Sequence, residues 1–448
     1  MNSVVIDGVI RPSRTGDLDG SGGSSGPSAL AGPGLASKSS VIRRVLAFAG
    51  PGYLVAVGYM DPGNWATSLS AGSEFGYSLL SVILLSNGMA MLLQAAAVRL
   101  GIASGLDLAQ SCRRHFSPEV NFALWLACEV AIVACNVAEV LGMACGLGML
   151  FHIPLVLGVC ITALDVMLVL RLQRRGVRHL ELFIVGLVGL IGACLAAQMW
   201  WLHPPVAAMA QGFLPTSQIV TRPEMLYLAV GIVGATVMPH NLYLHSSIVQ
   251  TRAPDRSEGG IRHAIRYATV DSNLALGLAL FVNVAILVLA AGAFHHPGQP
   301  PVSELQDAYR LLTPLLGAAA GTVFGIGLIA SGLSSSITGT LAGQIVMEGF
   351  LDIRVSRARR ALLTRGLAIV PAVAVTIAFG DAGVGRLLVL SQVILGLQLP
   401  FAVVPLLWFT TRSKHLGAHA FKASTAAILW SIAMASIAIN VWGLYELV

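Results

Sequence analysis

The stretches GYMDPGNWAT (58–67) and GATVMPHNLY (234–243) each interrupt a long apolar run with a proline. Proline removes an amide donor and clashes with the preceding turn of a helix, so each stretch should unwind its helix. Two helices broken at matching positions of two chain halves are typical of inverted-repeat transporters, with a substrate site near the middle of the membrane. The two stretches therefore predict the fold class and the position of a site.

Composition places these breaks in a membrane. Of 448 residues, 56% are hydrophobic and 11% are charged, whereas soluble domains carry about 25% charged residues. Because lipid offers no partner to backbone groups, the long apolar runs must be helices. We predict an all-α polytopic membrane protein with its transmembrane transport domain over 41–448. The Gly-, Ser- and Pro-rich residues 1–40 predict a disordered cytoplasmic tail.

Hydropathy and charge predict eleven transmembrane helices. They lie near 44–71, 76–99, 119–146, 154–172, 179–201, 224–250, 267–293, 315–347, 362–380, 385–410 and 423–446. With this count the basic loop residues gather on one side, which places the N-terminus in the cytoplasm and Val448 outside. The formal net charge of +6 therefore reflects membrane topology and does not indicate nucleic-acid binding.

Eleven spans divide into five, five and one additional helix. The two halves, about 44–201 and 224–410, would have opposite orientations, and the extra helix would be about 423–446. The first span of each half carries the Pro-containing break, as expected for inverted repeats.

The groups at the two breaks suit a soft divalent cation. Unwinding frees the backbone carbonyls of Gly58 and Ala235, and Asp61 adds a carboxylate at a depth where an unpaired charge is costly. Asn64 contributes an amide oxygen and Met238 a thioether. The sulfur adds little for Mg²⁺ or Ca²⁺ but favours Mn²⁺, Fe²⁺, Co²⁺ and Cd²⁺. The alternative is that Met238 only fills a gap between helices.

Three segments resemble signature segments of the Nramp family of metal-ion transporters. They are DPGNWAT (61–67), GATVMPHNLYLH (234–245) and SSSITGTLAGQIVMEGF (334–350), within a similarity over roughly 41–446. The resemblance implies a LeuT-like 5+5 inverted-repeat fold plus one additional helix, with helices 1 and 6 unwound in the middle. It also implies alternating access and import of Mn²⁺ or Fe²⁺ together with protons.

The resemblance assigns ion binding to the groups at the breaks. These are Asp61, Asn64, Met238 and the carbonyls of Gly58 and Ala235, and Gln392 matches a glutamine proposed to join when the site closes. The sequence departs from the family at two positions. Asn136 stands where many members have an aspartate of the proton route, and Leu333 stands where glutamine is usual.

Other titratable residues predict a proton route. Bound metal and proton would compete for Asp61, intramembrane acids mark ion paths, and histidine titrates near neutral pH. The candidates are Asp61, Glu129, Glu139, His240, His245 and Arg252. Glu139 matches the proton-pathway glutamate of the family. Glu129 could instead be a structural hydrogen-bond partner, and Arg252 an ordinary positive-inside residue.

The sequence thus predicts a proton-coupled secondary transporter that imports divalent transition-metal ions, Mn²⁺ first. We expect no cofactor, a monomer, and a position in the bacterial inner (plasma) membrane. Two alternatives are a LeuT-fold transporter of an organic solute such as an amino acid, and a metal-binding receptor that does not translocate. An enzyme is disfavoured because the sequence has no Walker loop, H-E-x-x-H or G-x-S-x-G motif.

Overall fold

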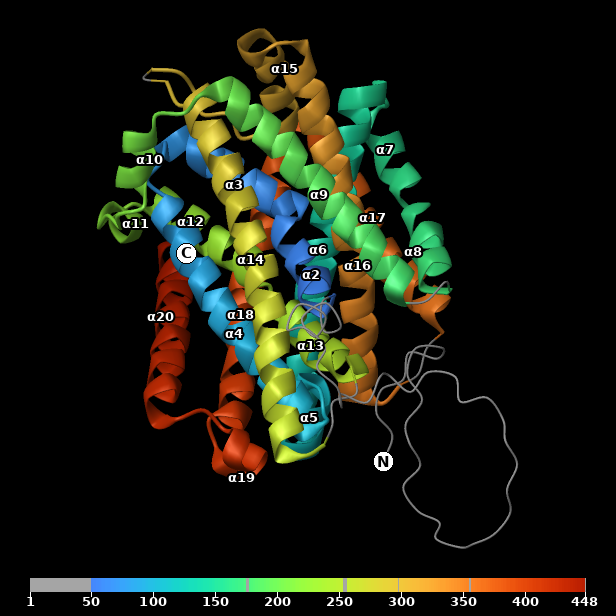
Figure 1. The fold of residues 1–448 in the computed structure, drawn as a ribbon. Coiled ribbons are helices and arrows are strands. Elements are labelled where there is room, and N and C mark those ends of the chain that lie inside the picture. The colour runs from blue at the N-terminus through green and yellow to red at the C-terminus, as the bar shows by residue number, and fades with distance from the viewer. Residues whose placement is uncertain (1–49, 175–176, 253–255, 297, 354–355, 448) are drawn as a thin grey trace, which may run out of the picture.

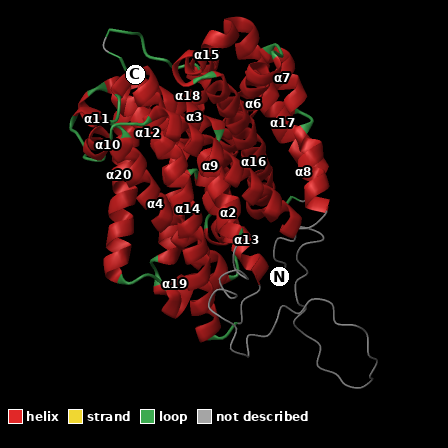
Figure 2. Cartoon of the chain, turned by 45° about the horizontal axis from the view of Figure 1, so that its top comes forward, coloured by secondary structure: helices red, strands yellow, loops and turns green. Residues whose placement is uncertain are grey.

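The computed structural model describes residues 50–174, 177–252, 256–296, 298–353 and 356–447. Regular secondary structure in these ranges is helical, with no strand (Figures 1 and 2). The predicted tail, 1–40, lies outside the described residues.

Ten helical segments of the described residues are long and apolar enough to cross a membrane. They comprise α4 (Leu80–Ser104), α6 (Pro118–Phe151), α7 with α8 (Leu155–Thr162, Asp165–Arg174), α9 (Val177–Leu202), α12 with α13 (Pro223–Val237, Pro239–Ile248), α14 (Glu258–Phe294), α16 (Ala318–Leu351), α17 (Arg357–Phe379), α18 (Val384–Thr410) and α20 (Ala423–Leu447). The eleventh predicted span is the first one, which is divided into α2 (Pro51–Ala56), the 3₁₀ turn η1 (Val57–Met60) and α3 (Pro62–Phe75). Neither half is long enough to cross alone.

Shorter helices connect these spans. They are α5 (Leu108–His115), α10 (Val206–Gly212), α11 (Gln218–Thr221), η2 (Val249–Arg252), α15 (Leu305–Leu316), η3 (Gly380–Gly383), α19 (Ser413–Leu416) and η4 (Gly417–His419). In Figure 1, α10, α11 and α15 lie at one end of the helix bundle, and α5 and α19 lie at the other.

Both expected breaks are present. Asp61 is extended (φ −65°, ψ 164°) between η1 and α3, and Met238 (φ 42°, ψ 91°) separates α12 from α13. Each is followed by proline, whose missing amide cannot continue the preceding helix. The predicted boundaries were wrong in detail elsewhere: the fourth span is interrupted between Thr162 and Asp165, and α14 begins at Glu258 rather than near residue 267.

Glycines allow the helices around the breaks to approach closely. A Cβ atom at Gly142 of α6 would collide with the ring of Pro62, and one at Gly234 of α12 would collide with the Gln392 carbonyl of α18. Small residues at such contacts are typical of membrane helix packing, because they let backbones approach. The first turn of α3 is thereby fixed between α6 and α18.

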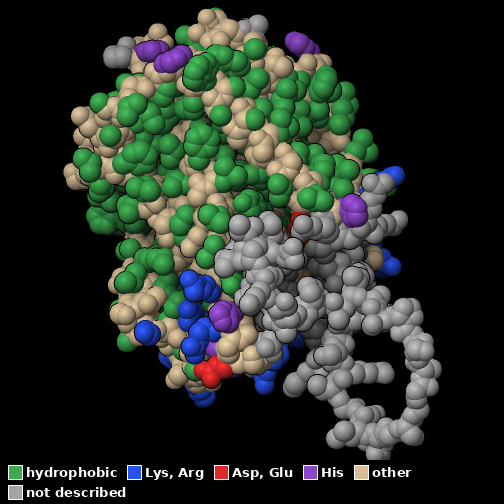
Figure 3. Space-filling view, viewed as in Figure 1, with side chains coloured by type: hydrophobic (Ala, Val, Ile, Leu, Met, Phe, Trp, Pro, Cys, Tyr) green, Lys and Arg blue, Asp and Glu red, His purple; other side chains and the backbone are tan. Residues whose placement is uncertain are grey.

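The surface divides into an apolar belt and a basic end. Figure 3 shows hydrophobic side chains over most of the visible face, and Lys and Arg gathered around the end with α5 and α19. Exposed side chains of the belt include Leu367, Phe401 and Trp442, at 46%, 53% and 53% exposure. An apolar belt with one basic end is the distribution expected of a protein that crosses a membrane.

Candidate functional site

The side chain of Asn64 joins the two breaks. Its Nδ2 atom donates to Asp61 Oδ1 at 2.7 Å and to the Ala235 carbonyl at 2.9 Å. The Asn64 backbone amide also donates to Asp61 Oδ1 at 3.0 Å, so Asp61 caps α3. The Asp61 carboxylate and the Ala235 main-chain carbonyl therefore converge on a single amide group, and Asn64 lies 171 residues from Ala235 along the chain.

Asp61 has no cationic protein partner among the described residues. Its side chain is fully buried, and its Oδ2 atom has no hydrogen-bond partner. A buried carboxylate with a free oxygen is costly inside a membrane unless a proton or a cation neutralises it. Asp61 Oδ2 is thus the atom of the site that a proton or a cation would neutralise.

Met238 directs its sulfur toward the first broken span. A Cβ atom at Gly58 would lie 3.0 Å from Met238 Sδ, and Asn241 Nδ2 lies 3.4 Å from the same sulfur. Asn241 Nδ2 also lies 3.5 Å from the Val55 carbonyl. The fully buried Met238 side chain therefore sits between the two broken helices rather than facing lipid.

Gln392 of α18 covers the first turn of α3. A Cβ atom at Gly63 would collide with the Gln392 side-chain amide, so a larger residue at this position would have to displace Gln392. Gln392 Nε2 donates to Ser391 Oγ at 2.9 Å, while its Oε1 atom is buried without a partner. A free amide oxygen is thus held next to the break.

The donors at the breaks form a mixed set. Within the described ranges, no group of three or more His, Cys, Asp or Glu side chains could hold a metal ion. The structure brings together one carboxylate, two amide side chains, main-chain carbonyls and a thioether, which is a combination of hard and soft donors.

Glu139 belongs to a second polar cluster, between α6 and α17. Its Oε2 atom lies 3.6 Å from Nη1 of Arg365. The same guanidinium forms an ion pair with Asp165 of α8, in which Nε lies 3.1 Å from Oδ1. Ser336 of α16 donates to Asp165 Oδ2 at 2.6 Å. One buried arginine therefore serves two carboxylates from different helices.

Glu129 has an arginine of its own. Arg360 Nη2 lies 2.5 Å from Glu129 Oε1, with side-chain exposures of 3% and 12%. Neither Arg360 nor Arg365 is among the residues that the sequence predicts for the site. For Arg365 a signal existed, because it falls inside the ninth predicted span, 362–380, where an arginine requires a buried partner.

The histidines that follow the second break occupy different environments. His245 Nδ1 lies 2.8 Å from Gln94 Oε1, and Gln94 Nε2 donates to the Tyr59 hydroxyl at 2.6 Å. The Tyr59 hydroxyl lies 3.3 Å from the Val237 carbonyl, directly before Met238. His240 is buried and its Nδ1 atom has no partner. A chain of polar groups thus links His245, but not His240, to the backbone at the break.

Two further candidates can be placed only in part. Asn136, at the departure from the family pattern, donates from Nδ2 to the Ile132 carbonyl of its own helix at 2.7 Å. Arg252 ends η2, and its side chain lies outside the described residues.

Known proteins resemble this chain both in sequence and in structure. Residues 52–446 match the family described as natural resistance-associated macrophage protein-like. A divalent metal cation transporter, MntH, of Bradyrhizobium diazoefficiens is 58% identical over 399 residues, covering 89% of each chain. The manganese transporter of Eremococcus coleocola, in a crystal structure with an aromatic bis-isothiourea substituted compound, has a TM-score of 0.84 and 38% identity, over 91% of this chain and 88% of that chain.

A more distant structure shares the fold alone. Mhp1, a nucleobase-cation-symport-1 family transporter, is 13% identical and has a TM-score of 0.61 over 89% of this chain and 90% of that chain. The helical arrangement thus extends beyond one family.

Proposed function

Since the chain belongs to the natural resistance-associated macrophage protein-like (Nramp) family, we propose that it imports divalent transition-metal ions together with protons. Mn²⁺ is the first candidate, followed by Fe²⁺, Co²⁺ and Cd²⁺. The observation that carries the proposal is the buried, unpaired Oδ2 of Asp61 at the point where two broken helices meet.

The ion would bind between Asp61 and the second break. Asp61 Oδ1 and the Ala235 carbonyl are two acceptors that both face Asn64 Nδ2. Rotation of the Asn64 amide would turn its oxygen inward, and a cation would then take the place of the amide hydrogens. The Gly58 carbonyl and Met238 Sδ complete the proposed ligands. Asp61 Oδ1 and the Ala235 carbonyl would each exchange a hydrogen bond from Asn64 for a metal bond, and Asp61 Oδ2, which has no partner, would gain one when both carboxylate oxygens bind the ion. The Gly58 carbonyl accepts from the Asp61 backbone amide at 3.3 Å and would bind the ion through its second lone pair.

Selectivity would come from the sulfur. Mg²⁺ and Ca²⁺ prefer oxygen ligands and gain little from a thioether, while Mn²⁺, Fe²⁺ and Cd²⁺ accept it. Met238 is held near Gly58 by the shape of the break, so an ion that binds there meets sulfur in place of one water ligand. Discrimination against abundant alkaline-earth ions follows from that exchange.

Gln392 would respond to the ion. It lies on α18 against Gly63, with a free Oε1 atom. A small movement of α18 toward α3 would bring this oxygen to the ion and close the outer side of the site. Alternating access then requires the ion itself to link α3, α12 and α18.

Proton coupling would begin at Asp61, because a proton and a metal ion compete for the same carboxylate. Protons released by Asp61 would pass to the cluster of Glu139 and Arg365, with Glu129 nearer the basic end. His240 and His245 follow the second break on α13, and we assign them and Arg252 to the same route. Intramembrane acids with a single basic partner are a recurrent arrangement in proton relays.

The distribution of basic residues supports an orientation in the membrane. The basic end with α5 and α19 (Figure 3) would face the cytoplasm, so the N-terminus would be cytoplasmic and the C-terminus outside. We place the protein in the plasma membrane of a bacterium as a functional monomer. An organic solute is a poorer substrate, because a carboxylate at the break repels the anionic group that such sites receive.

Uptake by the purified protein in liposomes tests the proposal. With an acidic exterior, Mn²⁺ should enter and the interior should acidify in proportion, while Ca²⁺ and Mg²⁺ should enter slowly. Mn²⁺ uptake without proton movement would refute the coupling. Tight Mn²⁺ binding without uptake would instead identify a receptor.

A further inference from the structure

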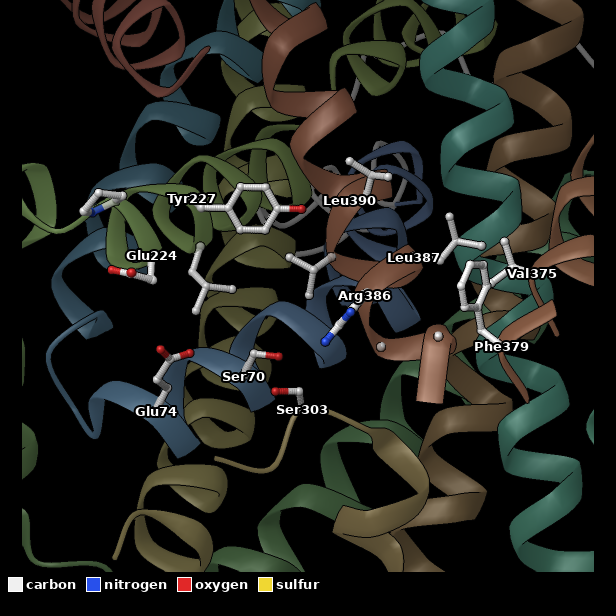
Figure 4. A pocket seen from close by; sticks show the side chains of 15 residues that line it. Ser70, Glu74, Glu224, Tyr227, Ser303, Val375, Phe379, Arg386, Leu387 and Leu390 are labelled. Atoms are coloured by element: carbon white, nitrogen blue, oxygen red, sulfur yellow. The ribbon is translucent and has the colours of Figure 1, made fainter. Parts of the chain in front are cut away.

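A second polar region lies near the outer ends of the spans. A cavity of about 800 Å³ is bounded by α3, α12, α17 and α18 and by Ser303. Figure 4 shows Glu74 and Glu224 on one side of it, Val375, Phe379 and Leu387 on the other, and Ser70, Ser303 and Arg386 between them. The cavity thus carries both signs of charge and an apolar side.

The charged groups of the cavity are not paired with one another in the described part of the chain. Glu74 extends from the last turn of α3 and Glu224 from the first turn of α12, while Arg386 lies in the first turn of α18. Two carboxylates alone would suit a metal cation, but the positive charge of Arg386 in the same cavity would repel such an ion. A ligand that carries both a positive and a negative group can pair with the two carboxylates and with the guanidinium.

Ser70 supplies an independent indication of a ligand. Its side chain is 5% exposed, it lines the cavity, and its hydroxyl has no hydrogen-bond partner. A buried hydroxyl without a partner costs about 1–3 kcal/mol. Because Ser70 lies between the acidic pair and Arg386 (Figure 4), a polar group that enters the cavity can hydrogen-bond to it.

The apolar side of the cavity is open to the lipid-facing surface. Phe379 of α17 is 68% exposed and Leu390 of α18 is 43% exposed, and both line the cavity. The two residues lie on membrane-spanning helices, at the end opposite the basic one. In the orientation proposed above, the polar side therefore lies at headgroup depth of the outer leaflet, and the apolar side faces the acyl chains.

The cavity is separated from the ion site. A Cβ atom at Gly231 would lie 3.3 Å from Thr67 Cγ2 and 3.5 Å from Val393 Cγ2, which shows how tightly α3, α12 and α18 pack below it. Gln392 lies against Gly63 one layer deeper. An occupant of the cavity would therefore contact the outer ends of these helices without touching Asp61.

We propose that this cavity binds a zwitterionic aminophospholipid, phosphatidylethanolamine, of the outer leaflet. Its ammonium group donates three hydrogen bonds, enough for both Glu74 and Glu224. Its phosphate accepts from Arg386 and from the hydroxyl of Ser70, and its acyl chains lie along Phe379 and Leu390. A choline headgroup has no N–H donor for the carboxylates, and an anionic glycerol headgroup meets two like charges.

Native mass spectrometry of the full chain tests the proposal, with phosphatidylethanolamine, phosphatidylcholine and phosphatidylglycerol of identical acyl chains. The wild type should bind one phosphatidylethanolamine about tenfold more tightly than either other lipid. Glu74→Gln with Glu224→Gln should remove this preference. Arg386→Gln should weaken binding of all three lipids. Arg310→Gln, an exposed arginine on α15 beside Asp307, is the matched control and should change nothing.

Several outcomes would overturn the proposal. Equal binding of the three lipids to the wild type would do so, and so would a preference that survives in the Glu74/Glu224 double variant. Competition by soluble glycerophosphoethanolamine as effective as that of the lipid would show that the acyl chains are not bound. If the double variant kept its lipid preference but lost Mn²⁺ uptake at low Mn²⁺ concentration, the two acids would belong to the ion's entry path instead.

Discussion

Asp61 and the acids that face α17 are all buried but differ in their partners. Glu129 and Asp165 each form an ion pair with an arginine of α17, and Glu139 lies near Arg365. Asp61 has only amide donors on one oxygen and nothing on the other. The comparison teaches that the fold supplies an arginine to the acids that face α17, and leaves Asp61, at the two breaks, with no cationic side chain among the described residues.

The energetic consequences of the two arrangements are opposite. Removing one member of a buried ion pair strands the other charge, which typically costs about 3–5 kcal/mol of stability. Removing Asp61 strands no charged partner and should leave the fold intact while removing the main attraction for a cation. Function and stability should therefore respond to different substitutions.

The largest effect is expected for Asp61→Ala. Mn²⁺ uptake into liposomes should fall at least about a hundredfold, since loss of the charged ligand removes several kcal/mol of binding. Thermal stability should stay at or above that of the wild type. Asp307→Ala on exposed α15 is the control and should transport normally. Near-normal uptake by Asp61→Ala would reject the site.

Arg365→Leu should affect stability most. It leaves Asp165 and Glu139 without their arginine, so we expect a loss of about 3–5 kcal/mol, seen as a lower melting temperature in detergent. Arg262→Leu breaks the exposed pair with Glu258 and should cost at most about 1 kcal/mol. Equal melting temperatures for the two variants would contradict the contrast between buried and exposed pairs.

Glu139→Gln separates the proton route from the ion site. The amide keeps the size of the side chain but cannot release a proton, so proton movement should weaken more than Mn²⁺ binding does. Internal acidification and Mn²⁺ uptake, measured in the same liposomes, give the ratio. A variant with wild-type pH-driven coupling would remove Glu139 from the route.

Met238→Ala should have a smaller effect, on selectivity alone. Mn²⁺ transport should persist through the oxygen ligands, while Ca²⁺ or Mg²⁺ should compete about tenfold better, because only the transition-metal ions lose a favourable ligand. Competition assays measure this shift. Unchanged discrimination would mean that the sulfur only fills space.

We expect no effect on transport for Asp107→Asn, the smallest effect of the series. Asp107 caps α5 outside the spans through its bond from Gln110 N at 2.8 Å, and burial raises its pKa from 3.8 to about 7. Between these values the folded carboxyl keeps a proton that the unfolded chain has released, so its contribution to stability falls as pH rises through this window. The melting temperature of the variant should therefore decline less than that of the wild type from pH 4 to pH 7. The variant should keep the helix, since Asn also caps helices. Parallel curves would exclude this titration.

The breaks could be predicted from sequence because their cause is local. Pro62 and Pro239 act on their own helices, and Asp61 and Met238 precede them directly. Burial of acids with arginines depends instead on how distant helices pack. Arg360 contacts Glu129 across 231 residues, and its place in a basic segment gave no sign of it.

Two other features could be predicted from the sequence only in part or not at all. The interruption of the fourth span between Thr162 and Asp165 has no glycine or proline to indicate it. The contact of Gln392 with Gly63 requires knowledge of where α18 crosses α3. Family resemblance named Gln392 as a ligand, but only the structure shows that its amide lies against Gly63.

Anomalous diffraction from crystals of the protein grown with Mn²⁺ tests the central claim most directly. We predict one strong peak within bonding distance of Asp61, Asn64, the Ala235 carbonyl and Met238 Sδ, and no such peak in Asp61→Ala crystals. A transport-competent protein whose peak lies away from both breaks, or persists without Asp61, would contradict the account.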